Sequence, residues 1–171
     1  MVLPWIGVGW RGTQITGTVV LVGASLLSSA CGGAHEPVAP SHSGLAELAT
    51  QYLRIAEPAN RRLEVDFDAL AGPDSNRLAR ALGDLRDAAS TERMFDRDLL
   101  RLSLPPAVEA TARDLVRTNE SRADLTSLLS ATSSLEQLRR QEKSLSTANA
   151  AVEVYVRSVR HQLGLPAPQT S

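Results

Sequence analysis

The sequence predicts an all-α domain, and three observations favour this fold class. Apolar residues recur at spacings of three and four from Leu45 to Leu163, which is the period of amphipathic helices. Aromatic residues make up only 4% of the chain, and no strand-like alternation competes. The apolar stretches are joined by short connections, which make sequential helices antiparallel. We therefore expect residues 44–165 to form an up-down-up-down antiparallel four-helix bundle, followed by a disordered tail at 166–171.

The first two predicted helices are separated by a turn at Gly72–Asp74. In the first helix, apolar residues from Leu45 to Leu70 share one face, and Pro58 removes one backbone donor inside that pattern. We therefore expect a kink or a break just before Pro58. The second helix carries apolar residues from Leu78 to Leu102, and we expect it to fray near Ser90–Thr91.

The third and fourth predicted helices are joined by a Ser-rich turn. Pro105–Pro106 fit the first turn of the third helix, where missing amide donors cost little, and its apolar stripe runs from Val108 to Leu129. The fourth stripe runs from Leu135 to Leu163, and Gly164–Pro166 end it by a left-handed glycine and a proline that cannot continue the helix. Two pairs have the capping-box spacing in the turn: Ser133 with Glu136 and Ser134 with Gln137.

The first 30 residues differ in composition from the rest of the chain. Arg11 is the only charged residue among them, and it precedes an apolar run from Ile15 to Leu27 and the small residues Ser28–Ala30. An apolar stretch of roughly 7–15 residues with a small-residue end is typical of secretory signal peptides. A membrane span needs about 20 apolar residues. We therefore expect a signal peptide at 1–30, with a retained signal anchor as the alternative.

The end of this leader resembles the lipobox of bacterial lipoproteins. The motif reads Leu27-Ser28-Ser29-Ala30-Cys31, with Ser28 where the family usually has Leu, Val or Ile. The resemblance implies that the Cys31 thiol receives a diacylglyceryl group and that a signal peptidase cuts between Ala30 and Cys31. It also implies that the lipid on Cys31 holds the protein at the outer face of the cell membrane. Cys31 is the only cysteine in the chain.

Residues 31–43 are rich in Gly, Pro, Ser and Ala and nearly free of bulky apolar side chains. Such a segment cannot bury enough surface to fold, so we expect a flexible tether between the lipid and the helical domain. His35 and His42 lie within the tether. Two imidazoles without Cys or carboxylate at ligand spacing rarely hold a metal ion, and we expect none there.

Composition argues against several functional classes. The chain has 18 Lys plus Arg against 19 Asp plus Glu, so it offers no basic excess to nucleic acid. The sequence contains no nucleophile elbow, phosphate-binding loop or dinucleotide fingerprint. The one histidine of the helical region, His161, lies near a helix end, where it complements the helix dipole. We interpret Asp96 and Asp98 as a solvated face. We therefore expect no catalytic residue, no cofactor and no metal.

Polar residues interrupt the apolar stripes near the middle of the predicted bundle. If the turn between the two helices is centred near Thr132, Arg122 and Glu142 are equally far from it and lie level with each other. We therefore expect the two to pair at the helix seam. Asn119 and Glu92 then lie one or two layers away. These four residues form a candidate polar core layer, which either fixes helix register or lines a ligand pocket.

Two short segments, Tyr52–Asn60 and Leu163–Pro166, resemble stretches of uncharacterised helical lipoproteins of high-GC Gram-positive bacteria. This resemblance implies a cell-envelope location and brings no activity with it. We therefore expect a membrane-anchored, non-catalytic helical module that binds or scaffolds an envelope protein. The alternative is a lipoprotein that binds or senses a small ligand through the polar layer.

Overall fold

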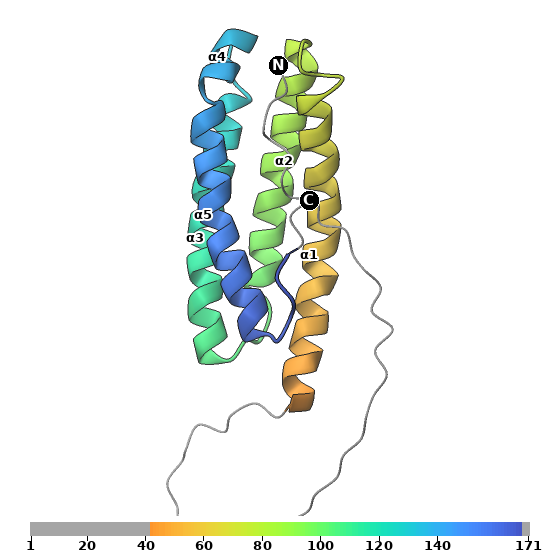
Figure 1. Cartoon of the computed structure of the whole chain (residues 1–171), viewed down its shortest axis with the longest axis vertical. Coiled ribbons are helices and arrows are strands. Elements are labelled where there is room, and N and C mark those ends of the chain that lie inside the picture. The colour runs from red at the N-terminus through yellow and green to blue at the C-terminus, as the bar shows by residue number, and fades with distance from the viewer. Residues whose placement is uncertain (1–41, 169–171) are drawn as a thin grey trace, which may run out of the picture.

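The computed structural model describes residues 42–168, and all regular elements in this part of the chain are α-helices. Long helices lie side by side, and one short helix lies at one end of the molecule (Figure 1). In chain order the helices are α1 (His42–Ala71), α2 (Leu78–Leu99), α3 (Pro106–Leu129), α4 (Leu135–Arg140) and α5 (Glu142–Gln162). The all-helical fold class is therefore confirmed. The expected signal peptide at 1–30 and the lipidation site Cys31 lie outside the described residues.

The expectation of a break at Pro58 is wrong, because α1 continues through this residue. Pro58 is exposed, while Ala56 and Ala59 beside it are buried, so packing holds the helix on both sides of the missing amide donor. The expected fraying of the second helix is also wrong. Thr91 is buried inside a continuous α2, where its backbone is protected by tertiary packing.

Two expected helix ends are confirmed. Pro105 and Pro106 occupy the N-cap and the first position of α3, where the missing amide donors cost little. At the end of α5, Gly164 has a φ of 70°, which is the left-handed conformation that glycine adopts most readily. The amide of Leu165 donates to the carbonyl of Arg160 at 2.8 Å, and the Leu165 side chain packs back on the core.

The fourth predicted helix is divided in two, which corrects the expectation of one continuous helix. Gln141 separates α4 from α5, and its amide bonds to the carbonyl of Leu138, three residues back, at 3.0 Å. Leu138 and Leu145, on either side of this turn, are both buried. Before α4, the Ser134 hydroxyl accepts a hydrogen bond from the Gln137 amide, which confirms the second of the two expected capping pairs.

The helices pack in a simple order, with α1 on α2, α2 on α3, α3 on α5, and α4 on α5. Their buried apolar side chains form two clusters, named here by their places in Figure 1. The lower cluster contains Ala49, Tyr52, Ala56, Leu99, Val108, Ala112, Leu115, Val116, Val152, Val156, Val159 and Leu163. The upper cluster contains Ala81, Leu85, Leu129, Leu138 and Leu145.

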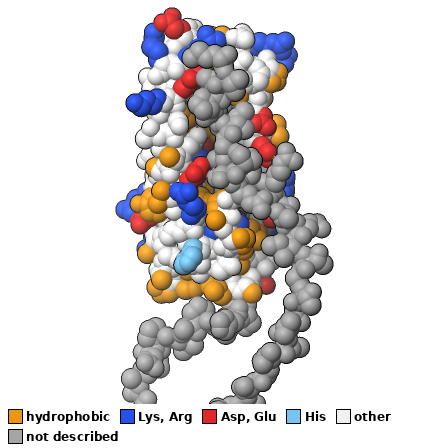
Figure 2. Space-filling view, in the orientation of Figure 1, with side chains coloured by type: hydrophobic (Ala, Val, Ile, Leu, Met, Phe, Trp, Pro, Cys, Tyr) orange, Lys and Arg blue, Asp and Glu red, His pale blue; other side chains and the backbone are white. Residues whose placement is uncertain are grey.

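The surface carries charges of both signs. Figure 2 shows basic and acidic side chains scattered along one face of the molecule, with apolar side chains gathered toward its lower part. The large apolar side chains that are exposed among the described residues are Val65, Leu100, Leu128 and Val154. Within residues 42–168, no helix combines the length and the hydropathy that crossing a membrane requires.

Candidate functional site

Polar side chains separate the lower cluster from the upper cluster. We define this polar layer as Glu92 and Asp96 on α2, Asn119 and Arg122 on α3, and Asn149 on α5. Glu92 has an exposed fraction of 0%, Asp96 of 3% and Asn119 of 1%. Buried side chains of these types require partners, because burying an unpaired polar group or charge is costly.

Helical spacing explains why α2 buries two carboxyl groups. Leu85, Ala89, Glu92, Asp96 and Leu99 follow one another at intervals of four and three residues, so they lie along one face of the helix. All five are buried. The two acidic residues therefore enter the core because of their positions, between apolar residues that hold the face against α3.

The centre of the layer is an ion pair between α2 and α3. Arg122 Nε lies 3.0 Å from Glu92 Oε1, and the Arg122 side chain is 12% exposed. Neither atom of this contact has a hydrogen-bond partner of good geometry. Arg122 Nη1 also donates to Asn149 Oδ1 on α5 at 3.4 Å, a long bond. The guanidinium group thus connects three helices through one charge contact and one weak hydrogen bond.

Asn119 connects α3 to α2 beside this ion pair. Its Nδ2 atom donates to Asp96 Oδ1 at 2.8 Å and to the backbone oxygen of Glu92 at 3.3 Å. A side-chain amide has two N–H donors, so both are used. Its own oxygen, Asn119 Oδ1, has no hydrogen-bond partner among the described residues, and neither has Asp96 Oδ2.

The environment favours protonation of the buried carboxyl groups. Burial raises the pKa of Glu92 to about 7, although the positive charges of Arg122 and Arg93 lower it. The pKa of Glu92 therefore lies above that of an exposed glutamate, which is about 4.3.

Burial also raises the pKa of Asp96 to about 7. The hydrogen bond from Asn119 lowers this pKa, as does the charge of Arg122, whereas the negative charges of Glu120 and Glu92 raise it. A negative charge on Glu92 therefore favours the protonated form of Asp96.

Three of the four residues expected in the layer come together, and Glu142 does not. Arg122 bonds to Asn149 on α5, seven residues further along the chain than Glu142, which is about 10 Å along a helix. The expected register is wrong because the connection between α3 and α5 is longer than one turn and contains α4. Leu129 ends α3 and Glu142 begins α5, so residues at equal distances from these two ends lie level.

The interpretation of Asp96 as part of a solvated face is also wrong. Asp98 is 42% exposed at its side chain and pairs with Arg101, as a solvated residue would, but Asp96 is buried. The signal that identifies Asp96 is its spacing of four residues from Glu92 and three from Leu99. Asn149 could have been found in the same way, because it lies between the buried residues Leu145 and Val152 of α5.

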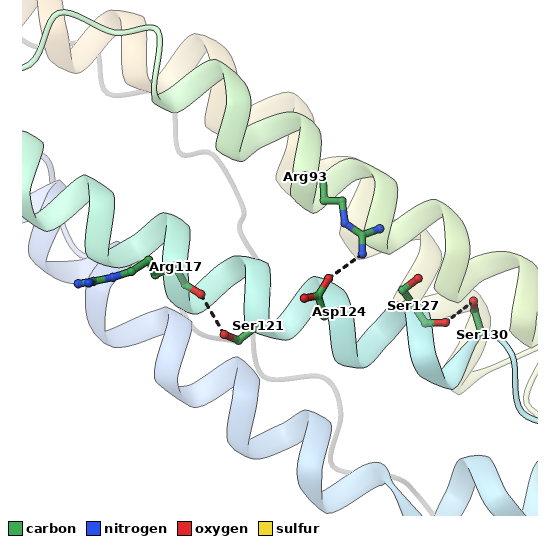
Figure 3. A network of polar contacts seen from close by, with 6 residues as sticks. All are labelled: Arg93, Arg117, Ser121, Asp124, Ser127 and Ser130. Atoms are coloured by element: carbon green, nitrogen blue, oxygen red, sulfur yellow. Dashed lines mark hydrogen bonds and ion pairs between the residues drawn. The ribbon is translucent and has the colours of Figure 1, made fainter.

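A second ion pair between α2 and α3 lies at the surface and behaves differently. Arg93 Nη2 donates to Asp124 Oδ1 at 2.9 Å (Figure 3). The side chains of Arg93 and Asp124 are 41% and 77% exposed, so solvent screens their attraction. Ser121 and Ser130, also shown in Figure 3, donate to carbonyls of their own helix, and both bonds stay within α3 and its end.

A shallow pocket of about 530 Å³ lies between α1 and α2, apart from the polar layer. It is lined by Pro58, Arg61, Arg62, Val65, Asp66, Asp87 and Thr91. Burial raises the pKa of Asp66 to about 6, and the negative charges of Asp87 and Asp84 raise it further. None of the residues of the polar layer lines this pocket.

Within residues 42–168, no group of three or more His, Cys, Asp or Glu side chains is arranged so that it could hold a metal ion. His161 lies in the last turn of α5 and is exposed, consistent with a role at the helix end.

The chain was compared with protein-family models, with curated proteins and with solved structures, and none of the three comparisons finds a match.

Proposed function

We propose that this chain is a lipid-anchored, non-catalytic module of the cell envelope that binds another protein through its helical domain. We further propose that this domain is an up-down-up-down four-helix bundle formed by α1, α2, α3 and α5. The observation that carries the anchor is the position of Cys31, the only thiol of the chain, directly after an apolar run and three small residues.

Lipidation supplies the membrane affinity that this proposal needs. Each buried CH₂ of an acyl chain contributes about 0.8 kcal/mol, so two or more chains on Cys31 hold a protein firmly at a bilayer. Residues 42–168 contain no helix suited to crossing a membrane, so in this proposal the described domain lies outside the bilayer.

Cross-helix hydrogen bonds support the proposed topology. Between neighbouring helices, residue numbers rise on one helix as they fall on the other, as in antiparallel pairs. The bonds between α2 and α3 join Asp96 to Asn119 and Arg93 to Asp124, and those between α3 and α5 join Arg122 to Asn149 and Thr111 to Gln162.

The proposal of a binding module follows from the residues that the domain offers. Catalysis by a serine or threonine needs a base at hydrogen-bond distance, and His161, the one histidine of α5, is exposed in the last turn of that helix. The face shown in Figure 2 instead presents charges of both signs, with apolar side chains gathered toward its lower part, and such a mixture suits a protein interface with a polar rim.

The anchor is tested by the intact mass of the full protein extracted from its own membranes. We expect the loss of residues 1–30 and the added mass of acyl groups on Cys31. A Cys31→Ser variant should keep the leader and lack the acyl mass, whereas Ser29→Ala, which keeps a small residue at that position, should be processed as the native chain is. An uncleaved, unmodified native chain would contradict the proposal.

Partner binding is tested by native mass spectrometry of the protein gently purified from its host. A stoichiometric protein that stays bound supports the module. A bound small molecule would instead favour the second candidate function, a ligand sensor. One observation favours that candidate: buried polar atoms of the layer, among them Asp96 Oδ2 and Asn119 Oδ1, have no hydrogen-bond partner.

A further inference from the structure

In the contact between Asp96 and Asn119, one of the two polar atoms of each side chain has a hydrogen-bond partner and the other has none. Asn119 Nδ2 donates to Asp96 Oδ1 at 2.8 Å, and the second hydrogen of the same amide goes to the Glu92 carbonyl at 3.3 Å. Asp96 Oδ2 and Asn119 Oδ1 stay without a hydrogen-bond partner. Both side chains are more than nine-tenths buried, so bulk water does not replace the missing partners.

These two atoms cannot satisfy each other while Asp96 is ionised. A carboxylate oxygen and an amide oxygen are both acceptors, and two acceptors do not form a hydrogen bond. One proton on Oδ2 changes this, because a protonated carboxyl group has one O–H donor. The carboxyl and the amide already share one hydrogen bond, so a second bond from Asp96 Oδ2 to Asn119 Oδ1 would close a ring.

We propose that the polar layer is a proton-binding site, in which Asp96 takes up a proton from solvent on Oδ2 and donates it in a hydrogen bond to Asn119 Oδ1. The resulting acid–amide pair has two hydrogen bonds, one in each direction. No other bond is made or broken, and the proton returns to solvent when Asp96 ionises. This proposal goes beyond the proposed function and does not depend on the lipid anchor.

The neighbouring charges assign the proton to Asp96 rather than to Glu92. Glu92 has a guanidinium nitrogen of Arg122 at 3.0 Å, and Arg93 adds a second positive charge near it. Both favour the ionised form of Glu92. The hydrogen bond from Asn119 and the more distant charge of Arg122 lower the pKa of Asp96, but its direct partner is a neutral amide, and burial with the negative charges of Glu120 and Glu92 favours the protonated form.

The other helices around Asp96 contribute groups that keep their charge state near neutral pH. From α1, Tyr52 packs its ring edge-on against Phe95, the residue before Asp96, at a centroid distance of 6.3 Å. Burial raises the pKa of Tyr52 to about 12, against the opposing charge of Arg160 from α5, so this phenol stays neutral. Asn149, the α5 residue in the layer, does not titrate.

Proton binding by Asp96 also affects the contact between α2 and α3. Asp96 lies on α2 and Asn119 on α3, so the second hydrogen bond strengthens the contact between these two helices in the middle of the molecule. When the proton leaves, the buried layer has two carboxylates facing one guanidinium group. The attachment of α2 to α3 is therefore tighter below the pKa of Asp96 than above it.

The test is a titration of the full chain followed by NMR, with ¹³C-labelled aspartate and ¹⁵N-labelled asparagine. The signal of the Asp96 carboxyl carbon is assigned by its disappearance in Asp96→Asn. We expect this signal to titrate with a midpoint near pH 7, in agreement with the effect of burial on its pKa, and the Asn119 side-chain amide to shift with the same midpoint. An Asp96 carbon that titrates below pH 5 would overturn the proposal, as would a midpoint near 7 that belongs to Glu92 alone.

A pair of variants provides a second readout. Asp96→Asn keeps the shape of the side chain, and its amide donates permanently where the proton would, so we expect the folding equilibrium constant at pH 8 to rise about tenfold, the factor that corresponds to one pKa unit. At pH 5 the same change should have little effect. The control Asp98→Asn alters a carboxyl group on the same helix that is 42% exposed, and no such rise is expected. Equal destabilisation by Asp96→Asn at both pH values would contradict the proposal.

Discussion

The lower cluster and the polar layer lie next to each other in the same core, and they owe their burial to the same helical spacing. In the lower cluster, Leu99, Leu115 and Val159 are fully buried and meet other apolar side chains. In the polar layer, Glu92 is buried to the same extent, but it meets a charged group, the guanidinium of Arg122. The comparison teaches that position on a helix face decides which residues are buried, whereas residue type decides what their burial contributes to the stability of the fold. The lower cluster supplies stability, and the layer makes stability depend on pH.

The largest effect is expected from truncating the lower cluster. Leu115→Ala removes a fully buried side chain and leaves a cavity, so we expect the free energy of unfolding to fall by about 3–4 kcal/mol in urea denaturation. The matched control is Leu128→Ala on the same helix, where the side chain is 69% exposed and the change should stay within about 0.5 kcal/mol. Equal losses in the two variants would mean that the cluster is not the stabilising region.

The next effect in size tests the ion pair of the layer. Arg122→Met leaves the Glu92 carboxylate buried without a counter-charge, and we expect a loss of about 3 kcal/mol at pH 8. At pH 5 the loss should be smaller, because the charge of Arg122 no longer opposes the effect of burial on the pKa of Glu92, and Glu92 of the variant can bind a proton there.

The double variant Arg122→Met, Glu92→Met separates pairing from stabilisation. Replacing both members of a buried ion pair by apolar residues of similar size is often neutral or stabilising. We expect the double variant to recover most of the loss at pH 8, measured by the same urea titration. A double variant as unstable as the single one would mean that the charges themselves hold α2 and α3 together.

A smaller effect is expected from pH alone. In the unfolded chain, aspartate ionises near pH 4, whereas in the folded protein burial raises the pKa of Asp96 to about 7. The folded state therefore binds the proton more tightly, so stability falls as pH rises from about 4 to about 7. We expect a loss of about 2 kcal/mol between pH 5 and pH 8, and a flatter profile in Asp96→Asn. A stability that rises over this range would contradict the assignment.

The smallest effect is expected at the edge of the layer. Thr126 is fully buried, and its hydroxyl oxygen has no hydrogen-bond partner. Thr126→Val keeps the shape of the side chain and removes this hydroxyl, so the free energy of unfolding should stay unchanged or rise by up to about 1 kcal/mol. A loss of more than about 1 kcal/mol would show that the hydroxyl does have a partner in solution.

Much of the helical fold could be predicted from the sequence because its signals are local. The stop at Gly164 depends on the backbone freedom of one residue, and the cap at Ser134 depends on a partner three residues away. The turn at Gln141 has no such signal, since it contains neither glycine nor proline.

The candidate site was predicted in part for a related reason. Glu92, Asn119 and Arg122 interrupt apolar stripes, and a stripe can be read within one helix. The partner on α5 depends on the length of the connection between helices, so an error in the turn moved the expected partner from Asn149 to Glu142. The acidic side chain of Asp96 favours a solvent-exposed position, although its spacing places it on the buried face of α2.

The edge-on packing of Tyr52 against Phe95 gives the folded domain an optical signature of its own. The two tryptophans of the chain are Trp5 and Trp10, both within the proposed leader at 1–30, and the aromatic residues of the described helices are tyrosine and phenylalanine. If the leader is removed, ultraviolet emission then comes from phenol rings alone, and one of them is enclosed in the core. A simple spectrum can therefore distinguish precursor from mature chain, and the same chromophore reports whether the core is intact.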